Sequence, residues 1–346
     1  MWPYWLMYLL PAVPALVTGR RPLRLSWMPW LALGALFVLL IGFRHHVGGD
    51  WGTYLIHYQR EIGSSLTDAI TTGDPGYVLL NRLMVQLDGD IYGVNLVCGL
   101  IFISGLIVFC RAQSRPWLGF AVAVPYLVIV VAMGYTRQSV ALGFIFWALT
   151  YLERGRFLPY VLFIVAATLF HKTAIIMIPL GIFLYSKGWL LRIIAVGLIG
   201  YGLWDAFVAP EQEKLWDTYV EQQMQSEGAR IRVMMNFVPA VFLLLNWKQW
   251  KRFYPNALLW FWMALGAIAS VFLVGFASTA VDRIALYLTP LQVVVFSRLP
   301  FLARKKIRQE TMTLGLVLGY ALVLYVWLNH ATHAVFWLPY RNILFE

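Results

Sequence analysis

A short segment that follows an apolar run gathers residue types that do chemistry. Residues 43–54 contain Arg44, two histidines, Asp50 and three glycines. Glycine lets a backbone bend closely around a bound group. The guanidinium of Arg44 either reaches for the membrane surface or binds a ligand. Asp50 is correspondingly either the ion-pair partner of Arg44 or a general base.

Two further polar groups lie between apolar runs. Arg137 follows one apolar run and precedes the next, and a charge at membrane depth is costly unless it faces a cavity or a partner. A guanidinium stays charged and binds phosphate oxygens in pairs, so we expect Arg137 to contact a ligand. His171 beside Lys172 offers a base next to a phosphate-binding cation. The alternative is a histidine whose hydrogen bonds are satisfied within the core.

Other arginines are predicted on the same side of the membrane. The adjacent Asp282 and Arg283 are most simply read as a local ion pair, and Arg230 and Arg232 as anchors at the interface. A set of cations beside an apolar wall suits a lipid diphosphate. The lipid tail would lie in the bilayer, and the cations would stabilise the negative charge of the diphosphate as it leaves. The predicted set is Arg44, Arg60, Arg82, Arg137, Lys172, Arg230, Arg232, Arg283 and Arg341. Nucleotide-binding loops, zinc motifs and nucleophile elbows do not occur in the sequence, so we predict neither a cofactor nor a metal.

The composition shows what must position these residues. Of 346 residues, 61% are hydrophobic and 12% are charged, whereas a soluble domain is roughly 45–50% apolar. The runs are long and continuous, which favours an all-α polytopic membrane protein over a barrel. We expect one integral membrane domain over residues 1–346 with about twelve spans. The predicted spans are 2–18, 27–43, 91–110, 117–133, 136–152, 157–171, 173–186, 189–208, 231–247, 256–277, 284–299 and 311–329.

The distribution of Lys and Arg residues predicts how the chain is oriented in the membrane. Most of the 27 Lys and Arg residues fall in connections that alternate onto one face, joined there only by Glu153 and Glu310. An excess of positive charge is typical of cytoplasmic connections. Two long loops, about 44–90 and 209–230, then lie on the outer side, and both predict amphipathic helices. Their apolar stripes are Tyr77, Leu80, Leu83, Met84 and Leu87 in the first loop, and Trp216, Tyr219, Val220 and Met224 in the second.

Five short motifs in this order resemble the EpsG-type family of Wzy-like bacterial polysaccharide polymerases. They are Arg44-x-x-x-Gly48-Gly49-Asp50-x-x-x-Tyr54, Asp74-Pro75-Gly76-Tyr77, Tyr135-Thr136-Arg137-Gln138, Phe170-His171-Lys172-Thr173-Ala174 and Pro339-Tyr340-Arg341-Asn342. Two positions depart from the pattern: Asp74 stands where Glu is expected, and Lys172-Thr173 where Ser is common.

The resemblance implies a GT-C-like membrane glycosyltransferase in the bacterial inner (cytoplasmic) membrane, with its active site facing the periplasm or outside. Such an enzyme transfers glycan, for an O-antigen or exopolysaccharide, from an undecaprenyl-diphosphate-linked donor onto a lipid-linked repeat unit, with a chain-length regulator as an expected partner. Metal-independent transfer would use Asp50 or His171 as the base. The diphosphate would be held by Arg137, Arg283 and Arg341, with Arg44 and Lys172 beside them. The aromatic rings of Trp51, Tyr54 and Tyr77 would stack on sugars.

Two other functions use the same residues. A membrane acyltransferase that modifies a glycan would use His171 or His46 as base, but the predicted cytoplasmic loops are short and offer no obvious site for an acyl donor. A flippase for lipid-linked oligosaccharide would carry charges along a path through both halves of the membrane. The predicted charges instead crowd one side, which favours a surface site.

Overall fold

The computed structural model describes residues 1–18, 26–62, 73–183, 189–207, 209, 226, 228–302 and 307–346. Within these residues the chain is all helical, as expected, and the only extended pairing is an isolated bridge between Arg44 and Asn342. The helices, in chain order, are α1 (Trp2–Val17), α2 (Trp27–Gly42), α3 (Trp51–Arg60), α5 (Pro75–Gln86), α6 (Ile91–Arg111), α7 (Pro116–Ala123), the π-helix η1 (Val124–Ala132), α8 (Thr136–Glu153), α9 (Phe157–Phe170), the 3-10 helix η2 (Lys172–Phe183), α10 (Trp189–Phe207), α12 (Ala229–Leu245), α13 (Trp247–Phe253), α14 (Ala257–Leu273), α15 (Ser278–Leu286), α16 (Pro290–Leu302), α17 (Gln309–His330) and the 3-10 helix η5 (Thr332–Phe336).

Where the structure describes them, the apolar runs predicted to span are helical over most of their length. Among the described helices, α6 and α17 are each long and apolar enough to cross a membrane. Up to four spans result if α12 with α13 and α15 with α16 are each counted as one broken span. Shorter apolar helices accompany them, so the chain has candidate membrane spans, while the predicted number of twelve stays a prediction. The predicted span 284–299 is not straight, because α15 and α16 meet at an angle of 51°.

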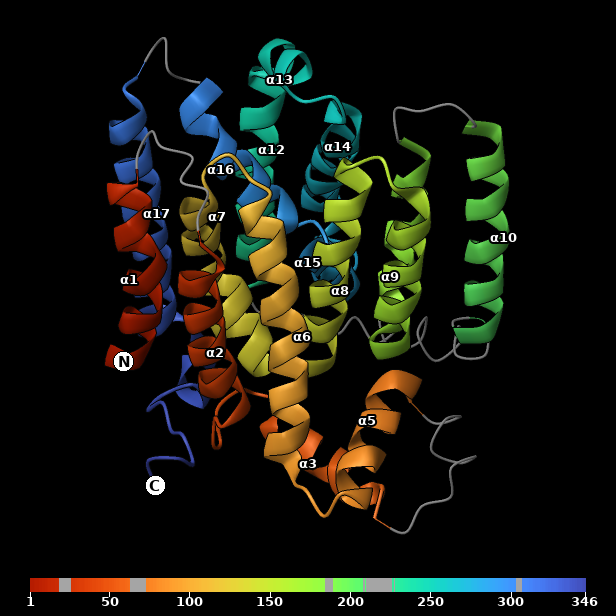
Figure 1. The fold of residues 1–346 in the computed structure, drawn as a ribbon, viewed down its shortest axis with the longest axis vertical. Helices are drawn as coiled ribbons and strands as arrows, with labels where there is room; N and C mark the ends of the chain where they lie inside the picture. Colours follow the sequence, from red (N-terminus) through yellow and green to blue (C-terminus); the bar gives the residue numbers. More distant parts are fainter. Residues whose placement is uncertain are drawn as a thin grey trace.

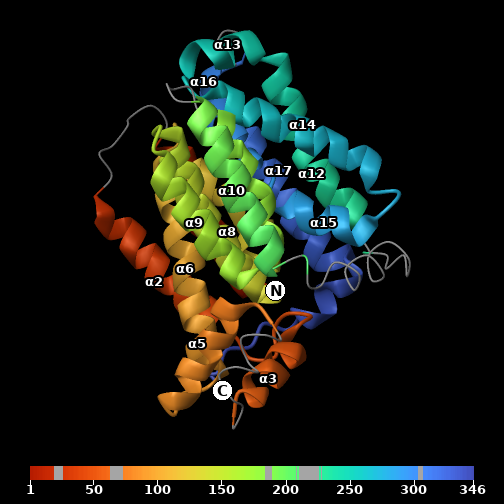
Figure 2. The same ribbon diagram turned by 90° about the vertical axis from the view of Figure 1, so that its right-hand side faces the viewer.

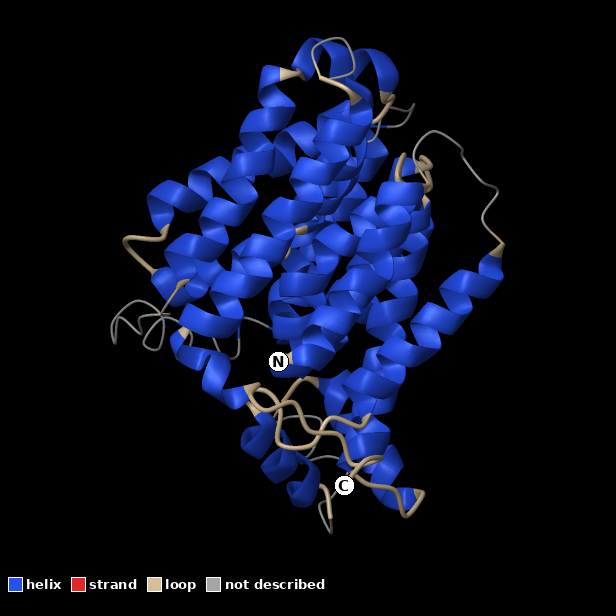
Figure 3. Cartoon of the chain, turned by 90° about the vertical axis from the view of Figure 1, so that its left-hand side faces the viewer, coloured by secondary structure: helices blue, strands red, loops and turns tan. Residues whose placement is uncertain are grey.

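The long helices run side by side, and two elements lie beyond one end of the bundle (Figure 1). Helices α3 and α5 lie at this end, together with the C-terminal segment, whereas α13 lies at the other (Figure 2). We call these the α3–α5 end and the α13 end. Connecting loops gather between the bundle and helices α3 and α5 (Figure 3).

Close backbone contact holds the middle of the bundle together. A Cβ atom added to Gly105 of α6 would lie 2.1 Å from the carbonyl oxygen of Gly143 in α8. Only small residues permit such an approach, which is how helices in membranes pack most tightly. Helix α8 therefore has a fixed position, and its two ends carry the two polar clusters of the molecule described below.

The predicted amphipathic helix in the first loop is α5. Its stripe is divided: Tyr77 and Leu80 are buried in the protein, whereas Leu83 and Leu87 are exposed. The helix thus packs on the bundle along one side and leaves apolar side chains uncovered along the other. The second predicted amphipathic helix, at 209–230, lies almost wholly outside the described residues, as do the basic positions Arg20, Arg21, Arg24, Lys187, Arg304, Lys305 and Lys306.

Candidate active site

Arg44 organises the α3–α5 end of the bundle. Its side chain is 1% exposed, and its guanidinium donates to the carbonyl oxygen of Ile41 at 2.6 Å. It also donates to Asn95 Oδ1 at 3.2 Å and to Thr136 Oγ1 at 2.8 Å. These contacts join the loop after α2 to α6 and to the start of α8. The structure therefore places Arg44 among internal partners, and it forms no ion pair with Asp50.

The loop that follows Arg44 is fixed by the C-terminal segment. The backbone N–H of His45 donates to the carbonyl oxygen of Arg341, and that of Gly48 donates to Phe336. Gly48 has a φ of +106°, and a Cβ there would lie 2.1 Å from the carbonyl oxygen of Met133. Glycine is required at this position on both counts. Two motifs almost 300 residues apart in the sequence are thereby held together.

Arg137 forms the central ion pair of the site. Its Nη1 lies 2.8 Å from Asp74 Oδ2, and the two side chains are 32% and 7% exposed. Its backbone N–H donates to the hydroxyl of Tyr54 at 3.4 Å. Burial raises the pKa of the Asp74 carboxyl, while Arg137 and Lys172 act in the opposite direction. Lys172 also donates a backbone hydrogen bond to Asp74, so the carboxylate joins α5, α8 and the start of η2.

His171 lies in the turn between α9 and η2, next to that pair. Its Nδ1 is 2.7 Å from Thr173 Oγ1 and 3.0 Å from the hydroxyl of Tyr287. The imidazole is buried, and the cations of Arg137, Arg283 and Lys172 are close enough to act on it electrostatically. The two hydroxyl groups fix its orientation.

Asp50 completes the cluster from the start of α3. Burial raises the pKa of its carboxyl, and Arg283 and Arg137 are close enough to oppose that change. Within the described residues the carboxylate makes no hydrogen bond. Gln138 Nε2 donates to the carbonyl oxygen of Arg283 at 2.9 Å, which places α15 against the start of α8.

These contacts gather most of the predicted polar residues. Asp50, Arg137, His171, Lys172 and Arg283 come from four separate elements and act on one another electrostatically. The cluster thus combines three cations, Arg137, Lys172 and Arg283, with the carboxylates of Asp50 and Asp74 at the end of an apolar bundle. Among the described residues, no three His, Cys, Asp or Glu side chains group as they would around a metal ion.

Other predicted residues lie differently. Arg341 is exposed, and its Nε lies 3.9 Å from Glu346, apart from the Arg137 cluster. The rings of Trp51, Tyr54 and Tyr77 are 7%, 5% and 2% exposed and pack in one apolar cluster with α6. Their faces are covered by protein, so in this conformation they support α3 and α5 and present no open surface for a sugar.

The structure also corrects the interpretations of Asp282 and Arg232, and it adds residues that the sequence did not single out. Asp282 pairs with Arg232 of α12 through two hydrogen bonds of 2.7 and 2.6 Å, and not with its neighbour Arg283. Tyr287 orients His171, but in the sequence it was one more aromatic residue inside an apolar run. Gln138 follows Arg137 directly, and that adjacency was the one available signal for its role.

Comparison with known proteins identifies the family. The model of the EpsG family matches residues 27–342, a range that includes every site residue described above. No curated protein and no solved structure matches the chain. The resemblance carried by the five short motifs is confirmed by this match over most of the sequence. The chain belongs to the EpsG family.

Proposed function

We propose that this protein is a membrane glycosyltransferase of the polysaccharide polymerase type. Family membership points to polysaccharide polymerisation, and the apolar helices to a membrane protein. The observation that carries the proposal is the gathering of Arg137, Lys172 and Arg283 around Asp50 and His171 at one end of the bundle. Donor, acceptor, GT-C-like architecture and sidedness are part of the proposal.

The donor in this proposal is glycan linked to undecaprenyl diphosphate. A diphosphate leaves with negative charge, and fixed cations stabilise that charge as it develops. Arg137 is the strongest candidate to contact it, because a third of its side chain is exposed while its other side is held by Asp74. Arg283 and Lys172 contribute charge from the neighbouring elements. Arg341 reaches the diphosphate only if its side chain turns away from Glu346.

The reaction proposed is a single displacement. The hydroxyl oxygen of the acceptor sugar attacks the anomeric carbon of the donor, and the bond from that carbon to the diphosphate oxygen breaks. The electron pair of that bond leaves with the diphosphate. The hydroxyl proton passes to a general base, for which Asp50 is favoured over His171. Its raised pKa makes it a stronger base than an ordinary carboxylate, whereas Nδ1 of His171 is already hydrogen-bonded to Thr173 and Tyr287.

His171 and Arg44 have positioning roles in this proposal. His171 is held by Thr173 and Tyr287 and orients the acceptor beside Asp50. Arg44 fixes the loop that carries Asp50 through its three internal hydrogen bonds. The α3–α5 end faces the periplasm or outside of the bacterial inner membrane, and all twelve apolar runs cross it. A chain-length regulator stays a prediction from the resemblance.

The experiment is a gel analysis of surface glycan from cells that lack the protein. Loss of the ladder, with single repeat units still exported, is the expected result. An unchanged ladder that lacks only acyl groups would overturn the proposal in favour of an acyltransferase. Lipid-linked units stranded on the cytoplasmic side would overturn it in favour of a flippase.

A further inference from the structure

A second polar cluster lies at the α13 end of the bundle. Helix α8 begins beside Arg137 and ends at Glu153, so its 18 residues separate the two clusters by about 27 Å. A cavity of about 330 Å³ opens there between the ends of α6, α8 and α16 and the connection before α14. Its polar lining comprises Ser114, Thr150, Glu153, Arg154, Tyr254, Asn256 and Arg298.

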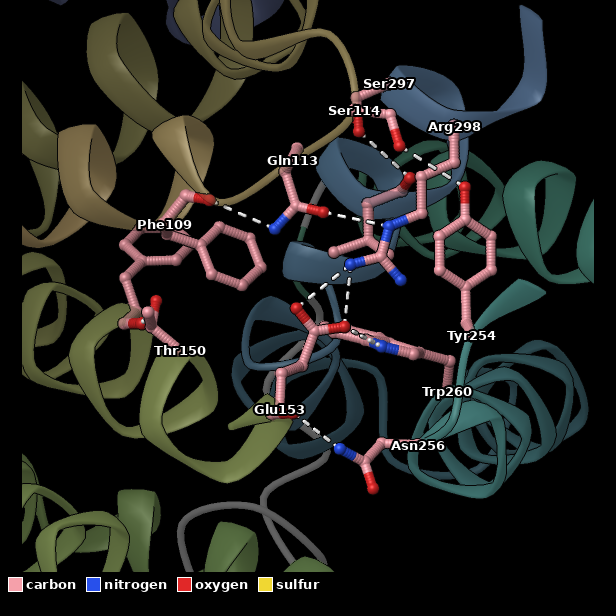
Figure 4. Close-up of polar contacts among 12 residues, drawn as sticks. Phe109, Gln113, Ser114, Thr150, Glu153, Tyr254, Asn256, Trp260, Ser297 and Arg298 are labelled. Atoms are coloured by element: carbon pink, nitrogen blue, oxygen red, sulfur yellow. Dashed lines mark hydrogen bonds and ion pairs between the residues drawn. The ribbon is translucent and has the colours of Figure 1, made fainter. Parts of the chain in front are cut away.

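The carboxylate and the backbone carbonyl oxygen of Glu153 already have partners on this wall (Figure 4). Arg298 Nη2 donates to both carboxylate oxygens of Glu153, at 2.7 and 2.9 Å, and Trp260 Nε1 donates to one of them at 2.7 Å. Asn256 Nδ2 donates to the carbonyl oxygen of Glu153 at 2.5 Å. The guanidinium of Arg298 lies 4.4 Å from the ring centre of Tyr254. Glu153 and Arg298 thus neutralise each other and form a rigid wall.

The cavity also contains donors that are not fully used within the protein. The hydroxyls of Ser114 and Tyr254 are 3.3 Å apart, and because either donates to the other, one hydroxyl hydrogen is left over. Arg154 is exposed, and no carboxylate among the described residues pairs with it. The lining therefore carries one net positive charge and unused donors, which is the complement of an anionic oxygen group.

We propose that this cavity binds a phosphate-bearing anion, with the phosphate oxygens against Arg154 and the Ser114–Tyr254 hydroxyl pair. An anionic phospholipid headgroup is the favoured source, because basic pockets between membrane helices recognise such headgroups. Exposed apolar side chains that could contact the acyl chains of the lipid lie nearby. Phe253 and Leu258 flank the connection between α13 and α14, and they are 56% and 45% exposed. A soluble phosphate compound offers the same chemistry. This site is separate from the proposed active site and does not depend on the function proposed for it.

The test uses the purified full-length protein in a neutral detergent. Binding is measured with dioctanoyl phosphatidylglycerol, with inorganic phosphate, and with uncharged dioctanoyl glycerol. The variants are Arg154→Gln and, as the matched control, Arg156→Gln, which removes an exposed arginine that does not line the cavity. Both positions are exposed, so neither change disturbs folding, and thermal unfolding verifies this for each variant.

We expect Arg154→Gln to weaken binding of phosphatidylglycerol about tenfold, the loss for one hydrogen bond to a charged group. Arg156→Gln should bind like the wild type. Tyr254→Phe, which removes one hydroxyl, should produce a smaller loss of about threefold. Binding of phosphatidylglycerol without inorganic phosphate assigns the lipid as the source, and binding of both assigns soluble phosphate as well. Equal losses in the two arginine variants, or equal binding of dioctanoyl glycerol, would overturn the proposal.

Discussion

Replacing Arg137 with alanine separates ligand binding from a purely structural role. The side chain neutralises Asp74 at 2.8 Å, and Asp74 is 7% exposed. Removing one partner of a fully buried pair costs about 3–5 kcal/mol. Because a third of the Arg137 side chain reaches solvent, we expect a smaller loss of about 1–3 kcal/mol in the free energy of unfolding. The protein should remain in the membrane.

The double variant Arg137→Ala with Asp74→Asn distinguishes the two roles. The second change removes the unpaired buried charge, so most of the lost stability should return. Polymer formation should not return, because the group that stabilises the leaving diphosphate is still missing. Loss of one such group costs about 10²–10³-fold in rate.

The assay uses protein in lipid vesicles supplied with lipid-linked repeat units, with the product ladder read on a gel. Thermal unfolding in detergent reports stability in parallel. Arg156→Gln, at the α13 end, is the charge-matched control. Polymer of normal amount and length from Arg137→Ala, or its recovery in the double variant, would show that Arg137 only neutralises Asp74 and that the diphosphate assignment is incorrect.

Three further outcomes test the rest of the site. Because the pKa of Asp50 is raised and the base must be ionised, polymerisation should fall as the pH drops through that pKa. Arg283→Gln removes a cation that lowers the pKa of Asp50, so the acidic limb of the pH–rate profile should move to higher pH. An acidic limb that does not move would argue against Asp50 as the base. Tyr287→Phe should reduce the rate less than tenfold and weaken acceptor binding, read as a raised KM, while Tm stays within a few degrees, since the one hydroxyl that contacts His171 and Thr173 is lost. Arg44→Met should lower stability by about 3 kcal/mol, measured as a lower Tm in detergent, because a buried hydrogen-bonding network loses its donor; an unchanged Tm would contradict the organising role.

The helices were the part of the fold that could best be predicted from the sequence. Continuous apolar runs become helix wherever the structure describes them, since a backbone in an apolar environment must satisfy its own hydrogen bonds. Arg137 and His171 were recognisable for a related reason, because a polar group between apolar runs is costly to retain without a role. Local composition was sufficient for both inferences.

Partners distant in sequence were not predictable in the same way. The acceptors of Arg44 include Asn95 and Thr136, and nothing near Arg44 in the sequence identifies them. The partner of Asp282 proved to be Arg232 rather than the adjacent Arg283, because the helical path brings α12 and not the neighbouring residue to its carboxylate. Whether an arginine is occupied internally or is available to a ligand depends on such pairings.

The docking of the C-terminal segment has a consequence for biogenesis. The loop that carries Arg44 is held by backbone hydrogen bonds from and to residues 336–343. After residue 48 has been synthesised, about 290 more residues must be added before those partners exist, which takes on the order of 15–60 s at typical rates of synthesis. Throughout that interval the loop after α2 lacks its C-terminal partners, although Asn95 and Thr136, which bind Arg44, are made earlier. The α3–α5 end of the molecule is thus completed only after nearly all of its helices have been synthesised.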